Sequence, residues 1–161
     1  FENARLEEIT DVPVWTRGKE YLLLKSPRPV PTKIPMIGLG LSVGGDIKDA
    51  EVVVVNDFEE LKKAEVTGKI VMLNGVWDQS YSNTVKYRAH GAAEAAKRGA
   101  IGLIIRTIGP KSLENPHTGR QEYEEGVTKI PSCAISLEDA DMFARMAKRK
   151  QKITVDLYME G

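Results

Sequence analysis

The chain of 161 residues is long enough for one domain with its own hydrophobic core, or for one domain with an added arm. Its 23 lysine and arginine residues balance its 23 aspartate and glutamate residues, which removes the electrostatic case for a nucleic-acid or anionic-membrane partner. No apolar run approaches the roughly 18 residues that are needed to span a bilayer.

The two ends and the cysteine content bear on the origin of the chain. It begins at Phe1 with neither an initiator methionine nor a signal peptide, so we expect an excised part of a longer protein. Cys133 is the one cysteine, which rules out an internal disulfide, and no Asn-x-Ser/Thr sequon is present. Composition alone therefore leaves the compartment open.

Residues 1–33 are predicted to be an extended arm and a proline-rich linker. Residues 7–15 are extended in character, and a breaker at Trp15–Gly18 closes them. Four prolines then fall within residues 27–35, which disfavours helix and favours a semi-rigid extended segment. We expect the folded domain to occupy residues 34–161.

The domain begins with alternating strands and helices. The β-branched run Val52–Val55 predicts a strand that is buried on both faces. Asp57 and Glu60 form a capping-box pattern for a short helix that Gly68 terminates. Residues 69–73 are predicted to be the next strand.

A longer helix is expected over residues 84–98. Its apolar stripe is made of small residues that would let it sit close against a sheet, namely Val85, Ala89, Ala92, Ala93 and Ala96. Gly99 is placed to end this helix, and residues 101–105 read as another buried strand. The second half repeats the pattern with a strand at 130–135, a helix that Ser136 caps, and an alternating strand at 152–159. The order β-β-α-β-α-β-loop-β-α-β indicates a mixed α/β architecture.

Residues 106–129 do not fit this scheme. They contain two prolines and three glycines, and they show no sustained periodicity. Because unstructured connections longer than about 12–15 residues are uncommon in compact domains, we predict that this one is functional.

The residue types needed for metal or nucleophilic chemistry are scarce. The two histidines, His90 and His117, start no His-x-Asp pair and belong to no His-Glu-x-x-His motif. His90 and Glu94 lie one helical turn apart, but two ligands hold a metal weakly, so a solvated polar pair is favoured. Cys133 lies within a strand pattern and is interpreted as a buried packing residue. The glycines of residues 38–45 match no phosphate-loop spacing and favour a turn region.

Two clusters remain as candidate interaction surfaces. One lies around the polar turn after the strand at 69–73 and comprises Trp77, Tyr81 and Tyr87. These aromatic residues either anchor an interface or pack over a helix of the domain itself. The other lies in the long connection and comprises His117, Arg120, Gln121 and Tyr123. It faces either a substrate or another domain, or it is a solvent-exposed loop without a binding role.

Several stretches resemble the protease-associated (PA) domain family. The core signature is similar at Gly68–Val71, Ala95–Ala100 and Ile101–Ile105, and the second half is similar at Ile130–Ser136. Further stretches resemble the branch of PA domains found in carboxypeptidase Q-type exopeptidases, namely Pro13–Gly18, Leu39–Gly44, Thr84–Arg88 and Pro116–Tyr123. Many PA domains place an Arg-Gly pair and a cysteine where this chain has Asn74–Trp77, a departure that fits the same branch.

The resemblance implies the swivelling β/β/α fold of PA domains, a mixed sheet flanked by about three helices. It also implies a partner domain in the same chain, a di-zinc exopeptidase domain that would hold the zinc ligands and the catalytic carboxylate. The parent would be secreted or lysosomal, homodimeric, and active on peptides or dipeptides with unsubstituted termini. The present residues would then bind no zinc and catalyse nothing. They would shape access to the active site through the His117–Tyr123 segment, or mediate assembly through Trp77 and Tyr81.

Overall fold

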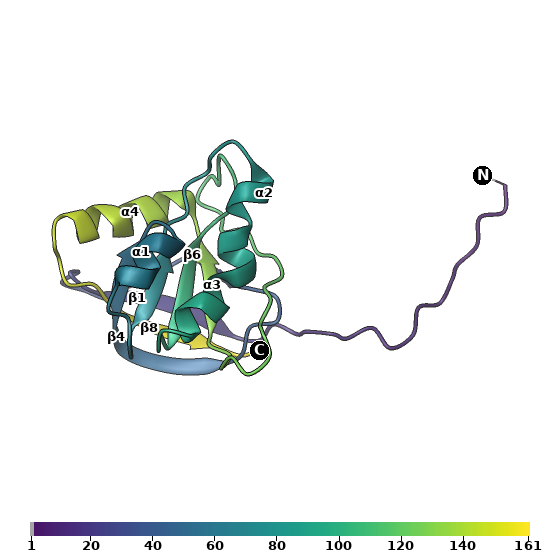
Figure 1. Ribbon diagram of the computed structural model, residues 1–161, viewed down its shortest axis with the longest axis horizontal. Coiled ribbons are helices and arrows are strands. Elements are labelled where there is room, and N and C mark those ends of the chain that lie inside the picture. The colour runs from purple at the N-terminus through teal and green to yellow at the C-terminus, as the bar shows by residue number, and fades with distance from the viewer. Residues whose placement is uncertain (1) are drawn as a thin grey trace.

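The computed structural model describes residues 2–161, so Phe1, where the predicted arm begins, lies outside the described residues. Its centre is one eight-stranded sheet in the order β2-β1-β8-β4-β5-β6-β7-β3 (Figure 1). The strands are β1 (Glu20–Ser26), β2 (Thr32–Ile34), β3 (Met36–Gly38), β4 (Gly45–Val55), β5 (Ile70–Leu73), β6 (Gly102–Arg106), β7 (Ser132–Ile135) and β8 (Thr154–Met159). The helices are α1 (Phe58–Lys63), α2 (Tyr81–Thr84), α3 (Lys86–Ala96) and α4 (Leu137–Lys148).

The sheet is mixed, as the family resemblance implies. Strands β4, β5, β6 and β7 are mutually parallel, whereas β3, β8, β1 and β2 pair antiparallel with their neighbours. Strand β3 at one end of the sheet approaches β1, the second strand from the other end, and the Gly38 N–H of β3 donates to Glu20 Oε2 of β1 at 3.0 Å. The sheet is therefore nearly closed.

Successive side chains of the parallel strands point to opposite faces of the sheet and pack into two separate hydrophobic cores. Ile70, Met72 and Ile104 point to the side where α4 contributes Ala140, Phe143 and Met146. The intervening residues of β5 and β6 point to the other side, where they meet Leu61 of α1 and Ala92 and Ala95 of α3. A strand covered on both faces must be apolar at every position, which explains the continuous apolar runs.

The local predictions for the helices are largely confirmed. Asp57 caps α1 by accepting the Glu60 N–H at 2.8 Å, and Ser136 caps α4 by accepting the Asp139 N–H at 3.0 Å. The predicted helix 84–98 is α3 with the short α2 before it, and Gly99 follows with a φ of +80°. Its close approach to the sheet is set by Gly91, where an added Cβ would lie 3.1 Å from Leu73 Cδ2.

The predicted extent of the arm and linker is wrong for residues 20–26 and 32–33, which belong to strands β1 and β2. Glu20–Ser26 is β1, which pairs with β8 and β2, and Leu22 and Leu24 are fully buried in the core. The surrounding prolines suggested a linker, whereas the pairing that makes this segment a strand comes from the far end of the chain. The division of the chain into an arm and a domain is otherwise a prediction.

Candidate functional site

The long connection between β6 and β7 is fastened to the body of the domain. The Gly40 N–H donates to the Gly119 carbonyl at 2.9 Å, and the Gln121 N–H donates back to the Gly40 carbonyl at 3.1 Å. The Glu122 N–H then donates to the Ala89 carbonyl of α3 at 2.8 Å. Because these bonds fix successive backbone groups, the segment presents its side chains in defined directions although it forms no regular element.

Two of the predicted interaction residues hold this connection in place. The Tyr123 hydroxyl donates to the Ile130 carbonyl at 2.9 Å and accepts the Ile130 N–H at 3.2 Å. Gln121 is 0% exposed, and its Nε2 donates to the Tyr123 hydroxyl at 3.5 Å. The side chain of Gln121 is therefore buried and bonds to Tyr123 of the same connection, and its role as a contact residue stays a prediction.

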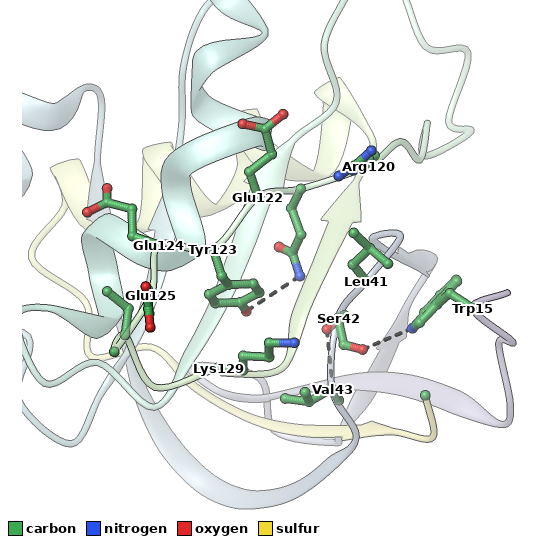
Figure 2. Close-up of a pocket in the computed structure, with 14 residues that line it drawn as sticks. Trp15, Leu41, Ser42, Val43, Arg120, Glu122, Tyr123, Glu124, Glu125 and Lys129 are labelled. Carbon is green, nitrogen blue, oxygen red and sulfur yellow. Dashed lines mark hydrogen bonds between the residues drawn. The ribbon is translucent and has the colours of Figure 1, made fainter. Parts of the chain in front are cut away.

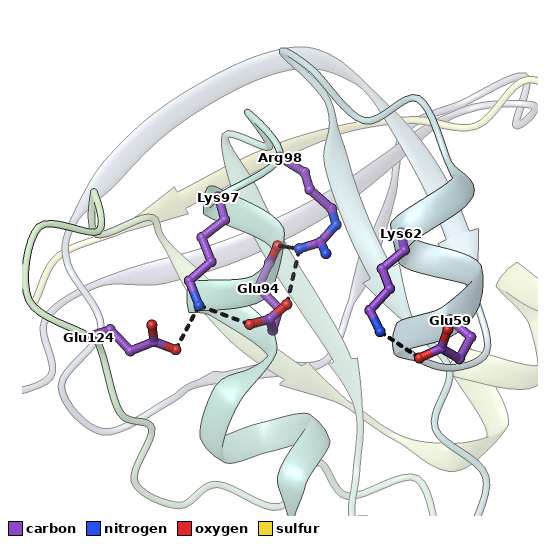
Figure 3. Close-up of polar contacts among 6 residues, drawn as sticks. All are labelled: Glu59, Lys62, Glu94, Lys97, Arg98 and Glu124. Atoms are coloured by element: carbon purple, nitrogen blue, oxygen red, sulfur yellow. Dashed lines mark hydrogen bonds and ion pairs between the residues drawn. The ribbon is translucent and has the colours of Figure 1, made fainter.

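Figure 3 shows how the connection is also tied to α3. Lys97 donates to Glu124 of the connection at 2.6 Å and to Glu94 of α3 at 3.0 Å. The hydrogen bond from Lys97, together with the neighbouring Arg98, holds the pKa of Glu94 below its usual range. Glu94 is thus engaged by two cations, and its helical neighbour His90 is exposed.

A cavity of about 830 Å³ lies where this connection meets the root of the arm (Figure 2). We name it the arm-root cavity, and its lining residues are Trp15, Leu41–Val43, Arg120–Val127, Lys129 and Gly161. Trp15 is fixed there because its indole Nε1 donates to the Ser42 carbonyl at 2.9 Å. The walls therefore come from the arm, the turn after β3, the long connection and the C-terminal residue.

The electrostatic character of the arm-root cavity is mixed. Arg120 and Lys129 are exposed cations, Glu122 and Glu125 are exposed anions, and among residues 2–161 none of the four forms an ion pair. Charges that are free at a concave surface are available to a ligand or to another protein surface.

The predicted long-connection cluster is only partly brought together. Arg120, Gln121 and Tyr123 line the arm-root cavity, whereas His117 does not. The His117 backbone N–H donates to Thr107 Oγ1 at 2.9 Å, and its side chain is exposed. Sequence reasoning missed Trp15 and Leu41 as lining residues. An isolated tryptophan before Gly18 was the one available indication for Trp15.

The aromatic cluster divides into an inward and an outward part. The Tyr87 ring packs edge-on against Phe58 with centroids 5.2 Å apart, and burial raises the pKa of its phenol. Tyr81 is 53% exposed, and its hydroxyl accepts a hydrogen bond from Arg88 Nη2 at 2.7 Å. Trp77 is half-buried. Tyr87 therefore packs over the domain's own helices, and Tyr81 and Trp77 remain accessible.

Nucleophilic and metal chemistry find little support in the described residues. Burial raises the pKa of the Cys133 thiol, which is 0% exposed, so the predicted packing role is confirmed. Among residues 2–161, no three His, Cys, Asp or Glu side chains lie close enough to hold a metal ion. Within the same residues, no helix has the length and apolar content that crossing a bilayer requires.

The nearly closed mixed sheet with its flanking helices defines the class of this domain. The PA domain model matches residues 48–143, so the chain belongs to the PA domain family. At the level of whole sequences, it is 44% identical to carboxypeptidase Q of Mus musculus and of Homo sapiens, over 99% of this chain in both comparisons. The chain spans 34% of the length of each of these relatives.

Solved structures agree with this family membership. A peptidase M28 precursor from Shewanella amazonensis superposes with a TM-score of 0.81 at 34% identity, over 92% of this chain and 36% of that one. An aminopeptidase from Aneurinibacillus sp. strain AM-1 has a TM-score of 0.60 at 19% identity, over 91% of this chain and 32% of that one. The second likeness supports the fold alone.

Proposed function

We propose that this chain is the non-catalytic PA domain of a longer zinc metallopeptidase of the carboxypeptidase Q type. In this proposal the arm-root cavity faces the catalytic domain and shapes the access of peptides or dipeptides to its active site. Support comes from the similarity to carboxypeptidase Q and to the M28 peptidase, both of which are much longer than the present chain.

The observation that carries the proposal is that the root of the arm and the C-terminal residue both lie at this cavity. Trp15 and Gly161 both line it, and the Gly18 N–H donates to the Glu160 carbonyl at 3.0 Å. Figure 1 likewise shows the arm leaving the body beside the C-terminus. In this proposal a neighbouring domain that packs against the root of the arm and the C-terminal residue covers the cavity, with Arg120 and Lys129 facing that domain.

Zinc, in this proposal, is bound by the other domain. The donor set of residues 2–161 does not fit a zinc site, because no three potential ligands converge. The contribution of this chain is therefore to bind and orient the peptide or the neighbouring domain. Secretion or delivery to the lysosome is part of the same proposal and rests on the family resemblance.

The test uses the full-length protein and dipeptide substrates. Arg120→Gln should raise KM several-fold with a smaller effect on kcat, because the cation is remote from the reacting bond. Arg145→Gln is the matched control, since Arg145 is an exposed arginine of α4 without an ion pair among residues 2–161. Unchanged kcat/KM for Arg120→Gln and for His117→Ala, with normal folding, would contradict a role in substrate access.

A second candidate function is assembly, which the exposed surface around α2 favours. Val76 and Tyr81 are both more than half exposed, and half-buried Trp77 lies between them in sequence. Such a surface suits a contact between two copies of the parent protein. Sedimentation of full-length protein carrying Trp77→Ala and Tyr81→Ala tests this. A dimer that survives both substitutions rules out the contact.

A further inference from the structure

Arg88 differs from the other half-buried basic side chains of the domain. Lys25, Lys69, Arg98 and Arg106 are also half-buried, and each forms an ion pair with a carboxylate. Among residues 2–161, no carboxylate lies within ion-pair distance of Arg88. Partial burial of a cation costs free energy that a paired carboxylate usually offsets. The Arg88 guanidinium bears this cost without a carboxylate partner among the described residues.

The Arg88 guanidinium is nevertheless held in one orientation. Its Nη2 donates to the Tyr81 hydroxyl at 2.7 Å, and its Cζ lies 5.8 Å from the centroid of the Tyr81 ring. On another side it packs against Gly119, where an added Cβ would lie 2.6 Å from Arg88 Nε and 2.7 Å from Nη1. Nε itself is buried and makes no hydrogen bond. The absence of a side chain at residue 119 therefore makes room for the guanidinium.

The position of Arg88 connects it to the arm-root cavity. Gly119 precedes Arg120, which lines the cavity, and the backbone on either side of Arg120 is fixed to Gly40. Arg88 thus reaches the long connection from α3 at Gly119, the residue before Arg120. Arg88 and Arg120 both lack an acidic partner among residues 2–161, and an unpaired cation favours a negatively charged group.

We propose that Arg88 is a binding site for a carboxylate. The planar guanidinium presents N–H groups in a fixed fork that matches the two oxygens of a carboxylate, and an orientation fixed in advance lowers the entropic cost of binding. Nη1 makes no hydrogen bond within residues 2–161 and Nη2 donates once, to Tyr81, so Nη1 and the second N–H of Nη2 are the donors left for the two carboxylate oxygens. The carboxylate is either the free C-terminus of a small peptide or an Asp or Glu side chain of a neighbouring domain, and the two share this chemistry.

The first experiment measures binding to the 161-residue chain and does not depend on peptidase activity. The probe is N-acetyl-alanyl-alanine, compared with its C-terminal amide, and the readout is the ¹⁵N–¹H signal of the Arg88 Nε group. We expect a saturable shift with the carboxylate and at least about tenfold weaker binding of the amide, because a charged partner is lost.

Two substitutions separate recognition from a structural role. Arg88→Lys keeps the charge but removes the fork, and it should weaken binding of the carboxylate while leaving the amide unaffected. Gly119→Ala keeps Arg88 but places a methyl group against its guanidinium, and it should also weaken binding. Arg145→Gln is the control and should bind as the unmodified chain does.

The second experiment identifies the source of the carboxylate in the full-length protein. If it belongs to a peptide, Arg88→Gln raises KM for substrates with a free C-terminus and not for amidated ones. If it belongs to a neighbouring domain, Arg88→Gln lowers the thermal midpoint more in the full-length protein than in the 161-residue chain. The proposal is overturned if the carboxylate does not shift the Arg88 signal and Arg88→Gln changes neither KM nor the thermal midpoint in these ways.

Discussion

Tyr123 illustrates how a polar aromatic residue in an irregular segment serves the interior. Its hydroxyl satisfies both backbone groups of Ile130, a residue that is buried just before β7. From the sequence alone, the same tyrosine is predicted to be a contact residue together with His117 and Arg120. Whether Tyr123 is a contact residue or bonds inside the domain depends on Ile130 folding back onto it. The residue types alone do not predict that contact.

Tyr123→Phe should lower the free energy of unfolding by about 1–2 kcal/mol, because two backbone groups of Ile130 lose their partner. Urea denaturation at neutral pH measures the change. Tyr81→Phe is the matched control, since the Tyr81 hydroxyl lies on an exposed side chain and bonds only to Arg88. Equal losses of unfolding free energy for the two variants would show that the bonds between Tyr123 and Ile130 stabilise the fold no more than the exposed bond of Tyr81 does.

Gly75 is a second residue whose role is steric. An added Cβ would lie 2.6 Å from Tyr87 Cε2, so Gly75→Ala should lower the free energy of unfolding by about 1–3 kcal/mol through overpacking. In a double-mutant cycle with Tyr87→Leu, the combined loss should be smaller than the sum, because leucine lacks the ring. Strict additivity would place the cause of the loss elsewhere.

At the scale of elements, local chemistry predicted most of the helices and the parallel strands. The cap residues Asp57 and Ser136, the β-branched β4 and the small-residue face of α3 each carry their information within a few neighbouring positions. Strand β1 was missed because its identity depends on β8, at the opposite end of the sequence. The arm-root cavity was missed for the same reason, since its walls come from four separate segments.

The end of α3 provides a pH-dependent prediction. Hydrogen bonding to Lys97 lowers the folded-state pKa of Glu94 from its ordinary value of 4.5, so the carboxylate stabilises the fold above that value. This contribution is lost as the pH falls through the lowered pKa. Glu94→Gln should therefore lower stability by about 0.5 kcal/mol at pH 7, with the difference vanishing in strong acid.

Thermal denaturation at a series of pH values measures this effect. Glu59→Gln is the control, because the pair between Glu59 and Lys62 on α1 is more exposed (Figure 3). Its substitution should change the thermal midpoint less. A difference between Glu94→Gln and the unmodified chain that persists unchanged into strong acid would contradict the assigned cause.

At the scale of the whole molecule, the arm is the part without a packing partner among the described residues. Leu6, Ile9 and Val14 are almost fully exposed, whereas Trp15 is anchored on Ser42. Exposed apolar side chains in series favour self-association. Replacing Leu6, Ile9 and Val14 with serine should therefore reduce association of the 161-residue chain, measured by sedimentation, without changing its thermal midpoint.

Trp15→Ala provides the contrasting variant for the arm. It removes an indole that lines the arm-root cavity and donates to the backbone, so the thermal midpoint should fall. If the serine substitutions lower the midpoint as much as Trp15→Ala does, the outer arm must pack on the domain in solution.

The place of β8 in the sheet has a consequence for how the domain acquires its structure. The last strand lies between β1 and β4, and Leu157 pairs with Leu22 on one side and with Ile47 on the other. During synthesis β1 and β4 therefore leave the ribosome before the strand that joins them, residues 154–159, has been made. Pairing over such a long sequence separation slows folding, and the sheet is completed only when residues 154–159 have joined it. A ribosome stalled before residue 154 should hold a domain whose β1 is still sensitive to protease.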